Sequence, residues 1–225
     1  MGKTEKMTKR EAAVFCLMAL LSGVVIGIGG TASLLAANTL GQAGKLVGAC
    51  LFSLGIYAII TYEMRLFTGM VPDIPDMDIK TMWQLPVCFI CNAVGVAIVA
   101  LLVSNTPIAE TVITQGSKVA EGKLNVNNWA LSALCSSMFC GILITLAVRS
   151  VKYAPKKGLN STLGVVFPII VFAFCGFDHS VANMLYFYFY GVCSWKLIGY
   201  ILLSIIGNIL GGVALPLVIK LKEKE

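Results

Sequence analysis

The 225-residue chain is 58% hydrophobic and 12% charged, with a formal net charge of +6. A typical soluble domain carries about 25% charged residues, so this chain lacks the polar surface of a water-soluble globule and lipid is its expected solvent. The basic residues gather in both tails and one short loop, beside apolar runs. That distribution is typical of membrane topology signals and excludes a nucleic-acid-binding surface.

The first apolar run, residues 12–37, is as long as a bilayer crossing and longer than the ~7–15 apolar residues of a signal peptide, so we expect a retained helix. Five further runs follow, two of them interrupted. They are 46–62 continuing through 66–70, 82–104, 129–148, 162–174 continuing through 180–193, and 195–219. Residues 105–128 are interpreted as a loop on the side opposite the basic tails.

The two interruptions, residues 62–69 and 175–180, place polar groups and a glycine at membrane depth. Irregular backbone is tolerated there only inside protein or along a water-filled cavity. His179, the single histidine, lies in the second interruption, and Thr68 holds the matching place in the first. Because an ionisable group inside a membrane is usually functional, we expect both to line one substrate pathway.

An Asn-x-x-Gly pattern follows each interruption, at Asn92 and at Asn208. Helix, interrupted helix and Asn-x-x-Gly helix therefore occur twice, and an odd number of spans per copy requires the second copy to be inverted. We predict one all-α membrane domain over residues 1–225, with repeats at about 12–104 and 128–219. Asp178, Asn92 and Asn208 are expected to support the breaks, Asp178 by accepting hydrogen bonds from freed backbone amides.

Catalytic patterns are weak in this sequence. The eight cysteines lie in or beside apolar runs, where cysteine behaves as a small hydrophobe. Cys88 and Cys91 form a C-x-x-C motif, but an apolar helix dulls thiol reactivity. No phosphate loop or Ser–His–acid arrangement stands out, so we expect no enzyme, cofactor or metal site. A membrane-embedded thiol enzyme remains a minor alternative.

Five motifs run through the chain in order. They are GKLVG at 44–48, FSLG at 52–55, LFTG at 66–69, GFDHSVANM at 176–184 and GNILGG at 207–212. In these motifs the sequence resembles the formate/nitrite transporter family, which also includes hydrosulfide channels. The resemblance implies an aquaporin-like six-helix protomer with broken second and fifth helices. It also implies a homopentamer in which each protomer has its own pore for a small monovalent anion.

The resemblance further implies roles for individual residues. Thr68 and His179 would line a polar chamber, and Lys123 would draw anions toward it. The apolar positions near two constrictions would be Phe52, Ile56, Leu66, Phe67 and Phe172. An anion that picks up a proton near the histidine would cross these constrictions as a neutral acid.

Several positions depart from the family pattern. Arg65 replaces the usual acidic residue, and with Glu63 it would form either a buried pair or part of the cytoplasmic mouth. Gly141 stands in place of an asparagine in the fourth span, which would remove one hydrogen-bond donor from the chamber. Pro72 and Pro75 oppose a regular helix after Gly69, and Asp73 and Asp76 should make the mouth less welcoming to anions.

These observations predict a channel or transporter for a weak-acid anion, with formate or nitrite first and hydrosulfide next, linked to a proton. The basic tails place both termini in the cytoplasm of a multi-pass protein in the cell membrane. The alternative is a pore for a neutral solute such as water or glycerol.

Overall fold

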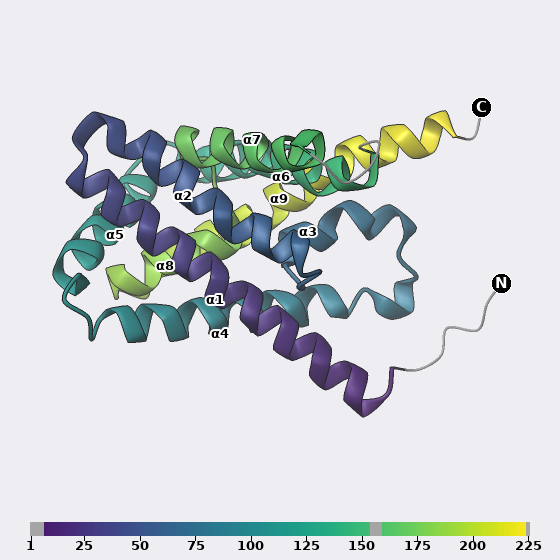
Figure 1. Ribbon diagram of the computed structural model, residues 1–225, viewed down its shortest axis with the longest axis horizontal. Helices are drawn as coiled ribbons and strands as arrows, with labels where there is room; N and C mark the ends of the chain where they lie inside the picture. Colours follow the sequence, from purple (N-terminus) through teal and green to yellow (C-terminus); the bar gives the residue numbers. More distant parts are fainter. Residues whose placement is uncertain (1–6, 154–158, 224–225) are drawn as a thin grey trace.

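The computed structural model describes residues 7–153 and 159–223, and these contain helices, turns and no β-strand. Figure 1 shows the helices as a bundle along the long axis of the molecule. In chain order they are α1 (Lys9–Thr39), α2 (Gly41–Thr61), α3 (Phe67–Met70), 3₁₀ helices η1 (Val71–Asp76) and η2 (Ile79–Thr81), α4 (Gln84–Val103), α5 (Ala109–Leu124), α6 (Trp129–Tyr153), α7 (Leu159–Cys175), α8 (Ser180–Tyr190) and α9 (Trp195–Lys222).

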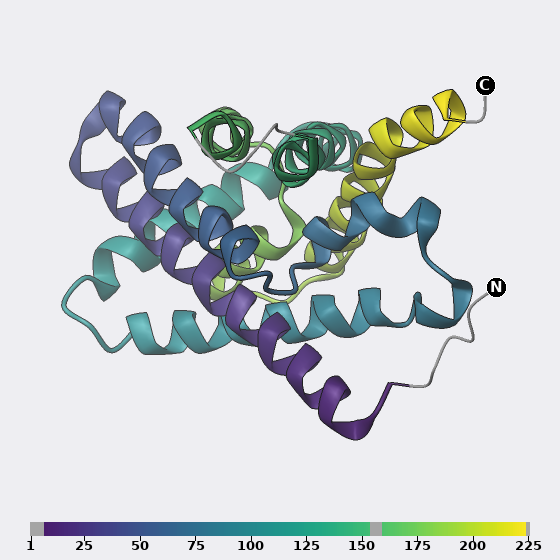
Figure 2. The same ribbon diagram turned by 45° about the vertical axis from the view of Figure 1, so that its right-hand side comes forward.

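Six helical segments in the described residues are long and apolar enough to cross a membrane. They coincide with the six spans expected from the sequence, so the all-α, six-span prediction is confirmed. The beginning of α1 and the end of α9 lie at the same end of the molecule, while the turn from α1 to α2 lies at the other end (Figures 1 and 2). Such an arrangement follows from an even number of crossings.

Helix α5 corrects the expectation of a loop over residues 105–128. Its sequence is too polar for a membrane span, but Val112, Gly116, Ala120 and Leu124 recur every fourth residue and are all buried. This spacing puts them on one helical face, which packs on α8. The periodicity was the signal that sequence reasoning missed.

Two sets of helices pack in the same pattern. Helix α1 packs on α2 and α4, and α6 packs on α7 and α9. The sets meet where α2 contacts α7, where α4 contacts α8 and where η1 contacts α9. In Figure 2, α6 and α7 are seen nearly end-on and side by side, with α1 and α2 crossing next to them.

Glycines bring the paired helices close together. A Cβ added to Gly23 of α1 would lie 2.0 Å from the carbonyl oxygen of Asn92, and one added to Gly141 of α6 would lie 2.4 Å from that of Asn208. Small residues permit such close backbone contact between membrane helices. Gly141, which was expected to leave a chamber donor missing, lies at this α6–α9 contact, where an asparagine side chain has no room.

Candidate functional site

Helices α2 and α7 end with the same hydrogen-bond pattern. The N–H groups of Glu63 and Met64 donate to the carbonyl oxygens three and five residues earlier, at 3.3 and 2.9 Å. Gly176 and Phe177 make the equivalent bonds at 3.2 and 3.0 Å. Glu63 and Gly176 both have positive φ, 52° and 73°, as the Schellman helix ending requires. The chain thus leaves both helices in the same way.

Asn92 on α4 fixes the start of α3. Its Oδ1 accepts from the N–H of Phe67 at 2.8 Å, which satisfies a donor at the helix start. Its Nδ2 donates to the carbonyl oxygens of Arg65 at 2.9 Å and Ala19 at 2.6 Å. One buried amide therefore joins α1, α4 and the segment before α3.

Asn208 on α9 does the same for α8. Its Oδ1 accepts from the N–H of Ser180 at 2.8 Å, and its Nδ2 donates to the carbonyl oxygens of Asp178 at 2.8 Å and Ser137 at 2.9 Å. The bonding of Asn92 and that of Asn208 correspond atom for atom. Both asparagines lie where a role in supporting the breaks requires them.

This correspondence changes the expected match between Thr68 and His179. Phe67 and Ser180 are the capped residues, so the residues just before them, Leu66 and His179, occupy equivalent places. Thr68 lies two residues further along its helix than the equivalent of His179. The two side chains nevertheless meet, with 2.8 Å between Thr68 Oγ1 and His179 Nε2.

Backbone bonding selects the protonation state of His179. Its Nδ1 accepts from the N–H of Ala182 at 3.1 Å, as a cap at the start of α8. Because Nδ1 must present a lone pair, the neutral ring carries its proton on Nε2, which donates to Thr68 Oγ1. No second partner for this hydroxyl exists among the described residues, so its own hydrogen has no acceptor there. The imidazole and hydroxyl are almost fully buried, at 1% and 2% exposure.

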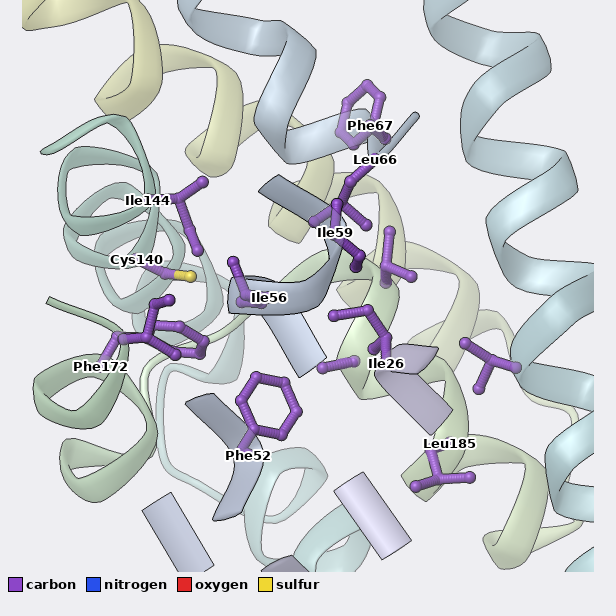
Figure 3. Close-up of a cluster of buried hydrophobic side chains, with 14 of the residues drawn as sticks. Ile26, Phe52, Ile56, Ile59, Leu66, Phe67, Cys140, Ile144, Phe172 and Leu185 are labelled. Carbon is purple, nitrogen blue, oxygen red and sulfur yellow. The ribbon is translucent and has the colours of Figure 1, made fainter. Parts of the chain in front are cut away.

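The five expected constriction residues are all buried in one hydrophobic cluster. Phe52 and Phe172 contact edge to face, with ring centroids 5.6 Å apart and planes at 89°. Phe172 also stacks on the imidazole of His179 at 5.8 Å. Figure 3 shows Phe52, Ile56 and Phe172 on facing helices, with Leu66 and Phe67 further along the cluster.

A cavity of about 390 Å³ opens at the end of the molecule that carries α5. Phe52, Phe172 and His179 are among the residues that line it, together with Asp178 and Lys123. Thr68 does not line it. The cavity is therefore lined by two phenylalanine rings and by the imidazole of His179, and Thr68 contacts that imidazole.

Lys123 lies in the last turn of α5 and not in a loop, and its charge is paired. Its Nζ lies 2.6 Å from Asp178 Oδ1 and donates to the carbonyl oxygen of Gly176 at 3.2 Å.

The Asp178 carboxylate also accepts from Asn183 Nδ2 at 2.8 Å and from the Tyr200 hydroxyl at 2.9 Å. The expectation that Asp178 binds backbone amides is wrong, because three side chains supply its donors. These bonds tie α5, α8 and α9 to the second interruption.

The acidic segment after Gly69 is 3₁₀ helix η1, in line with the effect expected of its prolines. Its two carboxylates are exposed, and each has a cation beside it. Asp73 pairs with Arg149 at 3.1 Å and Asp76 pairs with Lys220 at 2.8 Å. Each cation also bonds the carbonyl oxygen of the preceding proline. Both carboxylates expected to make the mouth less welcoming to anions are therefore paired with cations.

Glu63 and Arg65 are exposed and line a second cavity, of about 730 Å³, at the end of the molecule that holds the start of α1. Arg10, Glu11 and Gln84 also line it. No ion pair joins Glu63 to Arg65 within the described ranges. Of the two expected arrangements, Glu63 and Arg65 do not form a buried pair and instead lie at the mouth of a cavity.

The thiol of Cys88 contacts the backbone of the first interruption. Its buried thiol donates to the carbonyl oxygen of Arg65 at 3.3 Å and approaches Asn92 Oδ1 at 3.7 Å. Across residues 7–153 and 159–223, no group of three or more His, Cys, Asp or Glu side chains is arranged to hold a metal ion. Cys88 of the C-x-x-C motif thus helps to hold the first interruption.

Comparison with known families gives one match along nearly the whole chain. The model described as formate/nitrite transporter matches residues 2–221. YrhG of Bacillus subtilis (strain 168), named as an uncharacterized transporter, is 29% identical over 192 residues, which cover 76% of this chain and 69% of that protein. A probable formate transporter of Methanothermobacter thermautotrophicus is 26% identical over 87% of this chain and 83% of its own. Formate channel FocB of Escherichia coli (strain K12) is 26% identical over 80% and 67%, respectively.

Two solved structures have the same fold. A structure described as an FNT family ion channel superposes with a TM-score of 0.80 at 23% identity, covering 95% of this chain and 91% of that one. A pentameric formate channel with formate bound gives a TM-score of 0.80 at 19% identity, covering 97% and 100%.

Proposed function

The chain belongs to the formate/nitrite transporter family, and we propose that it forms a channel for a small monovalent weak-acid anion. Formate is the first candidate, because two relatives are named for it, followed by nitrite and hydrosulfide. The observation that carries the proposal is the cavity lined by Phe52, Phe172 and His179, among others. A polar donor buried behind apolar rings suits a small solute that must lose its water shell.

The pathway passes through two inverted repeats, residues 12–104 and 128–219, of one membrane domain. The matching helix endings, the matching amides of Asn92 and Asn208, and the matching packing of α1, α2 and α4 with α6, α7 and α9 support this. Interrupted helices in corresponding halves are typical of transport sites at the middle of a bilayer. Thr68 and His179 are then the polar centre of the pathway.

Passage is linked to protonation of the solute beside a neutral His179. The Nδ1 bond to Ala182 keeps the imidazole neutral, so the centre offers hydrogen-bond donors but no positive charge. A bare anion is costly to bury without a cation, whereas the neutral acid can share the Nε2–H and the Thr68 hydroxyl. The anion takes a proton from hydronium in the cavity, which leaves water behind. The neutral acid passes the apolar constriction and gives the proton to water on the other side.

The protein works as a homopentamer in the cell membrane, with both termini in the cytoplasm. The fold shared with a pentameric formate channel supports the assembly. The positions of the basic residues support the orientation, because short cytoplasmic loops carry an excess of Lys and Arg.

Flux into proteoliposomes tests the proposal. Protein-containing vesicles should take up formate, nitrite or hydrosulfide faster than empty vesicles, and more quickly as the external pH falls, because a larger fraction of the solute is then neutral. Water or glycerol flux without flux of any of these anions, at acid and neutral pH, would overturn it.

His179→Asn separates the two bonds of the imidazole. Asparagine is a good helix N-cap and can keep the bond to Ala182, but it is too short to replace Nε2 at Thr68. We expect slower flux with the same rise toward acid pH, because the group that takes up the proton is the solute and not the imidazole. A flat pH profile in this variant would assign the proton to the imidazole and contradict the proposed step.

A further inference from the structure

Of the charged side chains that line the cavity next to α5, some are in an ion pair and one is not. Lys45, Lys123 and Asp178 are its formally charged lining residues. The carboxylate of Asp178 lies 2.6 Å from Nζ of Lys123, with 3% and 14% of the two side chains exposed. These two opposite charges form a tight, mostly buried pair, so their fields largely cancel at the distance of the cavity entrance.

Lys45 has no such partner. It lies near the beginning of α2 and is exposed, and in the described parts of the chain its ammonium group makes no ion pair or hydrogen bond. The other polar residues that line the cavity near it include the neutral side chains Gln115, Ser33 and Ser132. The net positive charge of the cavity is therefore the charge of Lys45.

We propose that Lys45, and not Lys123, is the residue that captures the anion at this entrance, while Lys123 positions Asp178 and the second interruption. The inference rests on the proposed function. A free ammonium group at the wall of the cavity attracts small anions toward the pathway that Phe52 and Phe172 line. Because such steering acts through the solvent, it weakens as ionic strength rises.

The test is uptake of formate by intact cells that express the protein, so that only one face of the channel meets the substrate. Lys45→Gln removes the free charge, Lys45→Arg keeps it, and Lys118→Gln removes an exposed lysine of α5 that does not line the cavity. Initial rates are measured over a range of formate concentrations at low and high ionic strength, with protein amount in the membrane as the control for folding.

At low salt and low formate, Lys45→Gln should reduce uptake by roughly tenfold, the lower end of electrostatic steering effects. Its maximal rate should match the wild type, and its rate should depend little on salt. Lys45→Arg and Lys118→Gln should behave like the wild type. Equal concentration and salt dependence in Lys45→Gln and wild type would overturn the assignment while leaving the channel function intact. No formate uptake by the wild type would instead overturn the proposed function, and this inference with it.

Discussion

The imidazole of His179 makes one hydrogen bond to the backbone and one to a side chain. Nδ1 caps α8 through Ala182, and this bond leaves Nε2 as the donor toward Thr68. Since the imidazole is buried and stacked on Phe172, its orientation is held on two sides. Because Nδ1 is already bonded to the backbone, the imidazole presents its Nε2–H in a fixed direction. The same bond makes it less suited to act as a proton carrier.

Thr68→Val tests the hydroxyl at nearly constant shape. The change removes the acceptor of the Nε2–H and the free donor, and it leaves a buried polar group unsatisfied. We expect formate flux in proteoliposomes to fall roughly tenfold, the equivalent of one net hydrogen bond. Thr68→Ser keeps the hydroxyl and should retain most of the flux. Equal flux in Thr68→Val and wild type would show that the hydroxyl does not contact the solute.

At the scale of the helices, close glycine contacts set the distance between α1 and α4 and between α6 and α9. Gly95 approaches the carbonyl oxygen of Leu20, and Gly211 approaches that of Met138, at 2.1 and 2.0 Å from the position of an added Cβ. These contacts bring Asn92 and Asn208 within reach of the helix starts that they cap. Helix packing and the geometry of the site are therefore coupled.

Gly141→Ala should separate α6 from α9. The added Cβ would meet the Asn208 carbonyl oxygen at 2.4 Å, which neither backbone can relieve without moving. We expect a loss of about 1–3 kcal/mol of stability and a lower melting temperature in detergent. Gly122→Ala is the matched control, because nothing lies within 4 Å of its added Cβ on α5. It should gain about 0.5–1 kcal/mol through helix propensity. Equal melting temperatures for both variants would contradict the packing argument.

At the scale of the whole molecule, the outer faces of the spans are apolar. Large side chains such as Leu17, Leu54, Leu101 and Phe167 are more than half exposed. Contiguous apolar surface of this kind is covered by lipid or by another protein chain. These faces of the bundle are therefore the surfaces that lipid or neighbouring chains would cover.

The assembly is testable by native mass spectrometry after mild detergent extraction. We expect a complex of five times the 24.0 kDa of one chain, stable to dilution. A single chain at every protein concentration, with flux retained in proteoliposomes, would contradict the pentamer. That result would still be compatible with a pore in each protomer, because the proposed pathway lies within one chain.

Sequence reasoning succeeded where a local pattern has one structural outcome. The six apolar runs are spans because each is long enough to cross a bilayer, and the prolines after Gly69 do end the α-helix. It failed to predict which charged side chains have partners, and it misaligned Thr68 with His179. Lys123, Asp73 and Asp76 read as free charges, but their partners lie far away in the chain.

The sequence alone determined that this is a multi-span helical membrane protein of the formate/nitrite transporter family, because hydropathy and motif order are properties of the linear chain. Only the tertiary structure decided that Thr68 meets His179, that Asp178 neutralises Lys123 and that Lys45 is left as the free cation of the cavity. Pairing between side chains depends on distances of a few ångströms between helices, and those distances are set by packing of residues far apart in sequence.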